Sequence, residues 1–166
     1  EAIAERLKKA KLEKLVPWVH VGLTSFDTVD TAARLRLKEF FENDFNELLK
    51  DLRVELLRLT KAHAKTKCVG RTHGQWAVPS LFGLQFAEAL ERLSWNKDNI
   101  DMFVEKLCGQ SSGAIGGYHA SSMMSKDPLG LEDKFLKKLG LEQNLASLQI
   151  LPPEDVYMLA SSTFAL

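Results

Sequence analysis

The sequence predicts an all-α fold made of long helices. Between Gly22 and Gly70 the chain has neither glycine nor proline, the residues least favourable inside a helix. Within that stretch apolar residues recur at steps of three and four, the spacing of one helix face. These residues are Phe41, Phe45, Leu48, Leu52, Leu56 and Leu59. We find no convincing strand anywhere in the chain.

The first long helix is expected from about Thr28 to Ala64. Thr24, Ser25 and Asp27 precede or open it and supply the side-chain oxygens typical of a helix N-terminus. Such a helix measures roughly 55 Å at 1.5 Å per residue. A compact globule of this size is only about 40 Å across. The helix therefore needs partners, which predicts an oligomer.

A second long helix is expected from Ser80, directly after Pro79, to about Leu107. We expect the two long helices to pack roughly antiparallel in an elongated bundle. The apolar positions of this second helix are Phe86, Leu90, Leu93, Ile100, Val104 and Leu107. Shorter helices are expected at residues 1–14, at 131–139 and from Pro153 onward.

Composition excludes several classes of protein. Hydrophobic residues make up 45% and charged residues 27%, as in an ordinary globular protein. Lys plus Arg and Asp plus Glu each number 22, so bulk charge favours neither nucleic acid nor an anionic membrane as partner. No apolar run approaches the ~20 residues of a membrane span. Cys68 and Cys108 are expected to be buried thiols of a cytosolic protein rather than metal ligands.

Three segments between the expected helices carry polar residues and glycine: 18–27, 69–79 and 108–119. Loops at helix ends are common positions for catalytic groups. The second segment contains His73, and a histidine side chain is a residue type suited to proton transfer at neutral pH. Arg71 and Thr72 are suited to holding an anion beside it. The alternative is a histidine that only ties its loop to a backbone carbonyl.

The first segment contains His20 and then Thr24 and Ser25 at the expected helix start. Hydroxyls and backbone N–H groups at a helix N-terminus suit a carboxylate or a phosphate. The alternative is a simple helix cap.

The third segment contains Ser111, Ser112 and several glycines between Gly109 and Gly117. Successive N–H groups there are expected to form a nest around an anion. It lacks the Gly-Lys-Ser/Thr ending of a P-loop and the strand that precedes a dinucleotide-binding turn. The alternative is a flexible turn between helices.

Taken in order, these segments resemble the adenylosuccinate lyases of the fumarase/aspartase superfamily. His-Val-Gly-Leu-Thr-Ser-Phe-Asp at 20–27 is similar to their His-x-Gly-x-Thr-Ser-x-Asp stretch. Residues 70–75 resemble their Arg-Thr-His-Gly-Gln stretch, and 112–118 resemble their Gly-Ala-Val-Gly loop. Gln149-Ile150 followed by Asp155 resembles a further segment. The Thr-Ser-x-Asp and Thr-His-Gly pairs favour adenylosuccinate lyases over other branches.

The chain also departs from the family pattern. Trp76 replaces a frequent proline, and Gln110 replaces a frequent lysine. Pro152-Pro153-Glu154 replaces a segment that often carries a basic residue. The resemblance places a His-Asp-Val stretch just before Glu1 and a mobile Ser-Ser-x-Met-Pro-x-Lys loop well after Leu166. We therefore expect a central fragment, with 1–17 ending an N-terminal helical domain and 18–166 belonging to the central helical bundle.

The resemblance implies β-elimination of fumarate from a succinyl-substituted nucleotide in the cytoplasm, with no metal and no organic cofactor. His73 is implied as the acid that protonates the leaving nitrogen, and Thr24 and Ser25 as holders of a substrate carboxylate. Further implied substrate contacts are His20, Arg71, Thr72, Gln75, Ser112 and Gln149. The implied base is a serine of the downstream loop, so the fragment alone is expected to be inactive. A homotetramer with active sites shared between subunits is also implied.

Two alternatives remain beside this hypothesis. One is another lyase or cycloisomerase of the same superfamily. The other is a helical assembly domain without catalysis, because long unpartnered helices predict association whether or not the protein is an enzyme.

Overall fold

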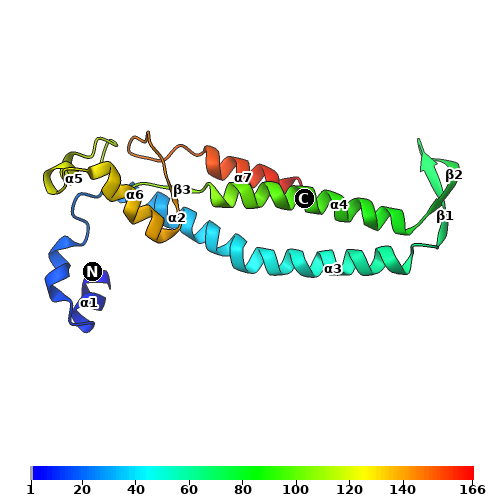
Figure 1. The fold of residues 1–166 in the computed structure, drawn as a ribbon, viewed down its shortest axis with the longest axis horizontal. Helices are drawn as coiled ribbons and strands as arrows, with labels where there is room; N and C mark the ends of the chain where they lie inside the picture. Colours follow the sequence, from blue (N-terminus) through cyan, green and yellow to red (C-terminus); the bar gives the residue numbers. More distant parts are fainter. Residues whose placement is uncertain (1) are drawn as a thin grey trace. The chain divides into compact units, whose positions relative to one another are not determined.

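The structure, a computed structural model, describes residues 2–166 and consists mainly of helices (Figure 1), which confirms the predicted fold class. The α-helices are α1 (Ala2–Lys9), α2 (Ser25–Phe40), α3 (Asn46–Ala62), α4 (Gly83–Glu105), α5 (His119–Met124), α6 (Pro128–Leu139) and α7 (Glu154–Phe164). The strands are β1 (Lys67–Thr72), β2 (Gln75–Leu81), β3 (Cys108–Gly109) and β4 (Glu142–Gln143). No helix within residues 2–166 combines the length and the apolar character needed to cross a membrane.

The chain forms two compact units. Unit 1 comprises the residues up to Arg36 together with Lys106–Pro153. Unit 2 comprises Leu37–Glu105 and Glu154–Leu166. Each unit combines segments far apart in the sequence, so each has its own core. The domain boundary expected at residue 17 stays a prediction.

Unit 1 contains a small apolar core beside a buried polar helix face. Leu107, Leu136, Leu141 and Leu151 are at most 3% exposed. Strand β3 pairs in parallel with β4, which brings the start of the 108–118 loop next to the end of α6. The buried residues of α2 are all polar, namely Asp27, Thr31 and Arg34. Their spacing of four and three residues puts them on one face of the helix.

Unit 2 is built on a pair of long helices. Helices α3 and α4 lie side by side and run in opposite directions, joined by the β1–β2 hairpin, and α7 packs along α4 (Figure 1). The predicted antiparallel packing of the two long helices is therefore confirmed. Their buried core is Phe41, Leu49, Leu93, Ile100, Val104 and Leu159.

The first long helix follows the predicted course with one local change. Residues 25–62 are helical throughout, but Phe41–Phe45 form a π-helical turn between α2 and α3. Such turns insert an extra residue into an α-helix. The ring centroids of Phe41 and Phe45 lie 4.9 Å apart, and those of Phe40 and Phe41 lie 5.3 Å apart. The π turn thus gathers three phenylalanine rings at one point of the helix.

The expectation that the chain has no strand is wrong. Segment 67–81 is an antiparallel hairpin, in which Cys68 pairs with Ser80 and Val69 with Pro79. The second long helix consequently begins at Gly83 rather than Ser80. Val69, Thr72, Trp76 and Val78 favour extended backbone, and the two-residue connection His73-Gly74 suits a tight hairpin turn.

Two shorter helices differ from their predicted bounds, and one further helix was not predicted. Helix α1 ends at Lys9, because Lys11 adopts a left-handed φ of 59°, and a 3₁₀ turn follows at Glu13–Trp18. Helix α6 begins at Pro128, where the Asp127 carboxylate accepts a hydrogen bond from the Gly130 N–H at 2.9 Å. Helix α5 lies where the third loop was expected to end and was not predicted.

The junction between α3 and α4 generates a stability prediction. A Cβ at Gly83 would lie 2.8 Å from the Thr60 carbonyl oxygen and 2.9 Å from that of His63. Gly83→Ala is therefore expected to destabilise the protein by about 1–3 kcal/mol through overpacking. The urea midpoint of the whole protein measures this. Glu91→Ala, at an exposed site on α4, should stay within about 0.5 kcal/mol. Equal shifts of the urea midpoint in the two variants would contradict the close approach of Gly83 to the carbonyl oxygens of Thr60 and His63.

Candidate functional site

The first predicted segment forms the start of α2. Asp27 Oδ2 accepts a hydrogen bond from the Thr24 backbone N–H at 2.8 Å, so the cap of the helix uses the Asp27 carboxylate. Among the described residues, the hydroxyls of Thr24 and Ser25 have no hydrogen-bond partner. The alternative, in which these hydroxyls serve as the cap, is not what the structure contains. They lie at the positive end of a 16-residue helix.

The third predicted segment is fixed between two carboxylates. The Gly113 N–H donates to Asp27 Oδ2 at 3.1 Å, and the Ser111 N–H donates to Glu132 Oε1. The Tyr118 hydroxyl donates to the other oxygen of Glu132. Two N–H groups of the expected anion nest thus bind carboxylates of the chain itself. A simple flexible turn does not describe this loop.

The base of the same loop is bound by Thr31 of α2. Thr31 Oγ1 donates to the Gln110 carbonyl and accepts from the Gln110 N–H, both at 3.1 Å. Gln110 is fully buried, and its Nε2 donates to the Gln149 carbonyl at 3.0 Å. Gln110, which stands where the family often has lysine, therefore links helix α2 to the segment that contains Gln149 through hydrogen bonds.

Two predicted substrate contacts of unit 1 are placed very differently. Ser112 is 1% exposed, and its hydroxyl lies 3.1 Å from that of Ser147. The Gln149 side chain is exposed, although its carbonyl is bonded. His20 is exposed and adopts a left-handed φ of 81°.

A cavity of about 560 Å³ lies between the first and third segments, within the size range of small-molecule sites. Its lining comes from both loops and from the start of α5. The lining residues are Gly22, Leu23, Gly113, Ala114, Ile115, His119 and Ala120. Unit 1 therefore brings two of the three predicted segments together around one space.

The second predicted segment, 69–79, lies within the β1–β2 hairpin of unit 2 and includes its tip. Thr72 pairs with Gln75, which leaves His73 and Gly74 as the two turn residues. Their φ angles of 50° and 75° are both positive, as in a type I′ turn. Arg71, Thr72, His73 and Gln75 are all exposed. Among the described residues the His73 side chain has no hydrogen-bond partner, so the alternative of a histidine tied to a backbone carbonyl does not hold within this chain.

Backbone strain coincides with the three predicted segments. Within residues 2–166, the non-glycine residues with positive φ are Lys11, His20, His73 and Tyr118. The last three fall one in each segment. A left-handed φ is uncommon outside glycine, and such strain concentrates at functional sites.

Sequence reasoning missed the role of Glu132. This carboxylate is 1% exposed and also accepts from Gln143 Nε2 at 2.8 Å, so three donors surround it. The available signal was its position four residues before the buried Leu136, on the apolar face of a helix. A charged residue on such a face is buried only when it is paired.

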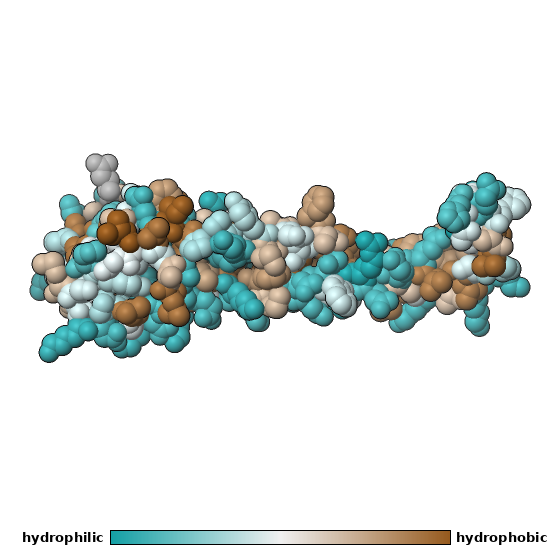
Figure 2. Space-filling view, turned by 90° about the horizontal axis from the view of Figure 1, so that it is seen from above, coloured by the Kyte–Doolittle hydropathy of each residue, from teal (hydrophilic) through white to brown (hydrophobic). Residues whose placement is uncertain are grey.

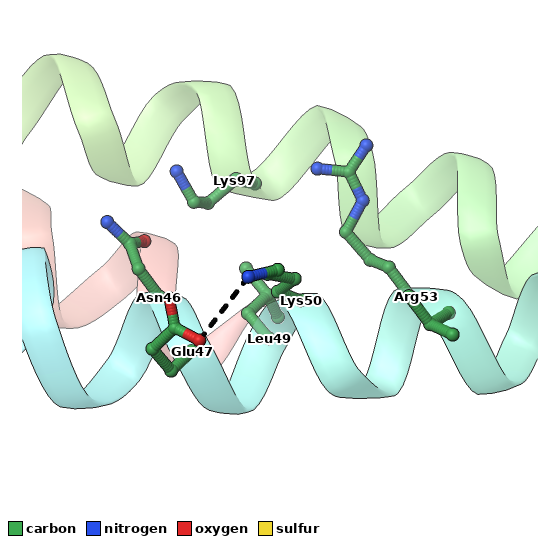
Figure 3. Close-up of a pocket in the computed structure, with 7 residues that line it drawn as sticks. Asn46, Glu47, Leu49, Lys50, Arg53 and Lys97 are labelled. Carbon is green, nitrogen blue, oxygen red and sulfur yellow. Dashed lines mark hydrogen bonds and ion pairs between the residues drawn. The ribbon is translucent and has the colours of Figure 1, made fainter.

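A second hollow lies between α3 and α4 and contains none of the predicted residues. It has a volume of about 450 Å³ and is lined in part by Lys50, Arg53 and Lys97. Figure 3 shows Arg53 extending from α3 toward α4, and Lys50 paired with Glu47 at 3.5 Å. Lys97 pairs with Asp101. The residues that line the groove supply positive charge but include no histidine or cysteine, so the candidate site is placed at the predicted segments instead.

The family comparison identifies the class of protein. A family model described as "Lyase" matches residues 1–165. The chain therefore belongs to this lyase family, which confirms the resemblance to the fumarase/aspartase superfamily.

The chain is similar to curated lyases of more than one specificity. Adenylosuccinate lyase of Pyrococcus abyssi is 35% identical over 144 residues, and that of Bacillus subtilis is 40% identical over 141. These matches cover 84% and 81% of this chain and 30% of each relative. N-acetyl-S-(2-succino)cysteine lyase of Dickeya dadantii is 34% identical over 128 residues, 75% of this chain and 27% of that protein. The chain thus spans about 30% of the length of the adenylosuccinate lyases it matches.

Solved structures show the same fold. Fumarate lyase from Mesorhizobium sp. BNC1 superposes with a TM-score of 0.73 at 22% identity, covering 88% of this chain and 34% of that one. The 3-carboxy-cis,cis-muconate lactonizing enzyme from Pseudomonas putida superposes with a TM-score of 0.76 at 24% identity, covering 99% and 40%. At these identities the likeness concerns the fold.

The Tyr118–Glu132 hydrogen bond generates a pH prediction. Burial, and then the hydrogen bond to Glu132 and its charge, raise the pKa of Tyr118 from 10.0 to about 12. The folded state thus favours the neutral phenol. Its stabilising contribution is complete below about pH 10 and is lost as the pH rises toward about 12.

Tyr118→Phe is expected to lower the free energy of unfolding by about 1.5–3 kcal/mol near neutral pH, because a hydrogen bond to a charged group is lost. The difference from the parent should narrow between pH 10 and about 12. Urea unfolding at several pH values measures both effects. Tyr157→Phe, at a side chain 66% exposed, is the control. If the loss of unfolding free energy in Tyr118→Phe stays constant up to pH 12, the raised pKa of Tyr118 does not contribute to stability.

Proposed function

We propose that the whole protein is an adenylosuccinate lyase. It would eliminate fumarate from adenylosuccinate and from the succinyl-aminoimidazole-carboxamide nucleotide, in the cytoplasmic synthesis of purine nucleotides. The observation that carries the proposal is the hairpin tip, where His73 is held at a left-handed φ beside Arg71 with its imidazole exposed. The similarity to adenylosuccinate lyases over more than four fifths of the chain supports it.

The reaction needs two kinds of group that these segments supply. Removal of a proton beside a carboxylate builds negative charge on that carboxylate, and donors aimed at the charge lower the barrier. The hydroxyls of Thr24 and Ser25, at the positive end of α2, are the proposed donors. The leaving nitrogen must gain a proton, and His73 is the proposed acid. The base is a residue outside this chain, so residues 1–166 alone would not catalyse the reaction.

The other predicted residues would bind the nucleotide. Arg71, Thr72 and Gln75 flank His73 on an exposed hairpin. His20 and Gln149 are exposed in unit 1. Ser112 is 1% exposed, so a substrate would reach its hydroxyl only after the surrounding loop moves. No step of this scheme needs a metal or an organic cofactor.

We propose a homotetramer in which sites are completed between subunits. Helix α3 buries Leu49 but leaves Leu48 and Val54 more than 60% exposed, and Trp95 of α4 is 73% exposed. Figure 2 shows apolar surface on unit 2, including the region where the hairpin meets α3 and α4. Contiguous exposed apolar surface is typical of interaction sites. In such an assembly the His73 hairpin of one copy would meet Thr24 and Ser25 of another.

His73→Gln tests the proposed acid. In the whole protein, kcat for adenylosuccinate is expected to fall at least about a hundredfold, because general acid catalysis supplies 10²–10⁴-fold. KM should change less than kcat if the contact strengthens only in the transition state. The assay follows fumarate release, and light scattering checks that the variant keeps the parent's mass.

His63→Gln is the matched control. His63 is half-buried at the end of α3, where its Nδ1 lies 3.3 Å from Thr66 Oγ1. The kcat of the His63→Gln variant should stay within about threefold of the parent value. A His73→Gln variant with parental kcat removes His73 from the mechanism. A parent protein active on N-acetyl-S-(2-succino)cysteine but on neither nucleotide would identify a different lyase of the family. A parent active on none of the three would favour an assembly role.

A further inference from the structure

The Asp27 carboxylate joins the two loops that line the cavity of unit 1. It is 3% exposed. Its Oδ2 accepts from the Thr24 N–H at 2.8 Å in the first loop and from the Gly113 N–H at 3.1 Å in the third. One oxygen atom therefore links segments 86 residues apart in the sequence.

The two loops also approach each other closely at their backbones. Gly113 adopts a φ of 85°, and a Cβ there would lie 3.6 Å from the Gly22 carbonyl oxygen. Gly22 and Leu23 line the cavity from one loop, and Gly113 lines it from the other. Since both loops bound the same space, a shift of either changes its shape.

The two oxygens of Asp27 differ in their hydrogen bonds, and this difference allows the effect of its hydrogen bonds to be separated from the effect of its charge. Among the described residues, Oδ1 has no hydrogen-bond partner, whereas Oδ2 accepts both bonds. An asparagine in the same place would keep its carbonyl oxygen at the Oδ2 position and put its NH₂ at the Oδ1 position. Asp27→Asn thus preserves both acceptor bonds while removing the charge, and Asp27→Ala removes both.

We propose that Asp27 is a positioning residue that fixes the Thr24 loop and the Gly113 loop to each other, so that they form one substrate-binding surface. Asp27 does not touch the substrate. It acts through the two N–H groups that it holds, and through them on the proposed carboxylate-binding hydroxyls of Thr24 and Ser25. The catalytic part of this inference rests on the proposed function, whereas the joining of the loops does not.

The experiment compares three variants of the whole protein. Asp27→Ala and Asp27→Asn change the link, and Asp127→Ala is the control. Asp127 caps α6 through the Gly130 N–H at 2.9 Å, so its loss removes a helix cap without touching the cavity. Two quantities are measured: kcat/KM for adenylosuccinate per folded enzyme, and amide hydrogen exchange of segments 20–25 and 111–117.

For Asp27→Ala, kcat/KM is expected to fall at least about tenfold, the effect of losing a hydrogen bond to a charged acceptor. Exchange should become faster in both segments together. Asp27→Asn should keep kcat/KM within about threefold, with small and equal changes in the two segments. Asp127→Ala should leave kcat/KM and both segments at parental values.

Three results would overturn the proposal. The first is an Asp27→Ala variant whose folded fraction keeps the parental kcat/KM, as expected of a helix cap alone. The second is an asparagine variant as impaired as the alanine variant, which would assign the role to charge. The third is faster amide exchange in segment 20–25 without any change in segment 111–117. If Asp27→Ala does not fold, the same comparison of the two segments is made with Asp27→Asn. If the parent has no activity on succinyl nucleotides, the proposed function fails, while the exchange data still decide whether Asp27 joins the loops.

Discussion

The buried polar face of α2 is the feature on which unit 1 depends. Asp27, Thr31 and Arg34 lie along it, and each binds the backbone of another segment rather than an apolar side chain. Asp30 beside them accepts from the Leu151 N–H at 2.8 Å, and Arg34 donates to the Pro152 carbonyl at 3.0 Å. Buried loops need partners for their polar backbone groups. A polar helix face supplies those partners and so makes two irregular segments part of a fixed structure.

Carboxylates inside a protein are unfavourable unless hydrogen bonds compensate the lost hydration. Asp27 and Glu132 meet this requirement at the 111–118 loop: Glu132 accepts from Ser111 and Tyr118 at its two ends, and Asp27 accepts from the Gly113 N–H between them. Glycine is required at position 116 of the same loop, because a Cβ there would overlap the Ser147 carbonyl oxygen. The loop is therefore held by hydrogen bonds to two buried carboxylates and by close packing at Gly116, and such support is what a binding surface needs.

The sequence predicted the long helices well, because apolar residues at steps of three and four between Gly22 and Gly70 leave little choice of structure. It also indicated the three segments in which His20, His73 and Tyr118 prove to be strained. It did not predict the β1–β2 hairpin, because the period-two signal there is weak and Pro79 favours a helix that starts at Ser80. Nor did it predict the role of Glu132, since a buried charge is recognised only through partners distant in the chain. The roles of the individual site residues stay predictions, because they depend on a substrate and on neighbouring copies.

The central claim is that His73 of one copy and the start of α2 of another form one active site. Coexpression of the His73→Gln and Ser25→Ala forms of the whole protein tests it most directly. If the claim is right, each variant alone is nearly inactive, whereas mixed oligomers contain some sites with neither substitution and recover fumarate release. Mixed oligomers that form but show no more activity than the separate variants would contradict the claim.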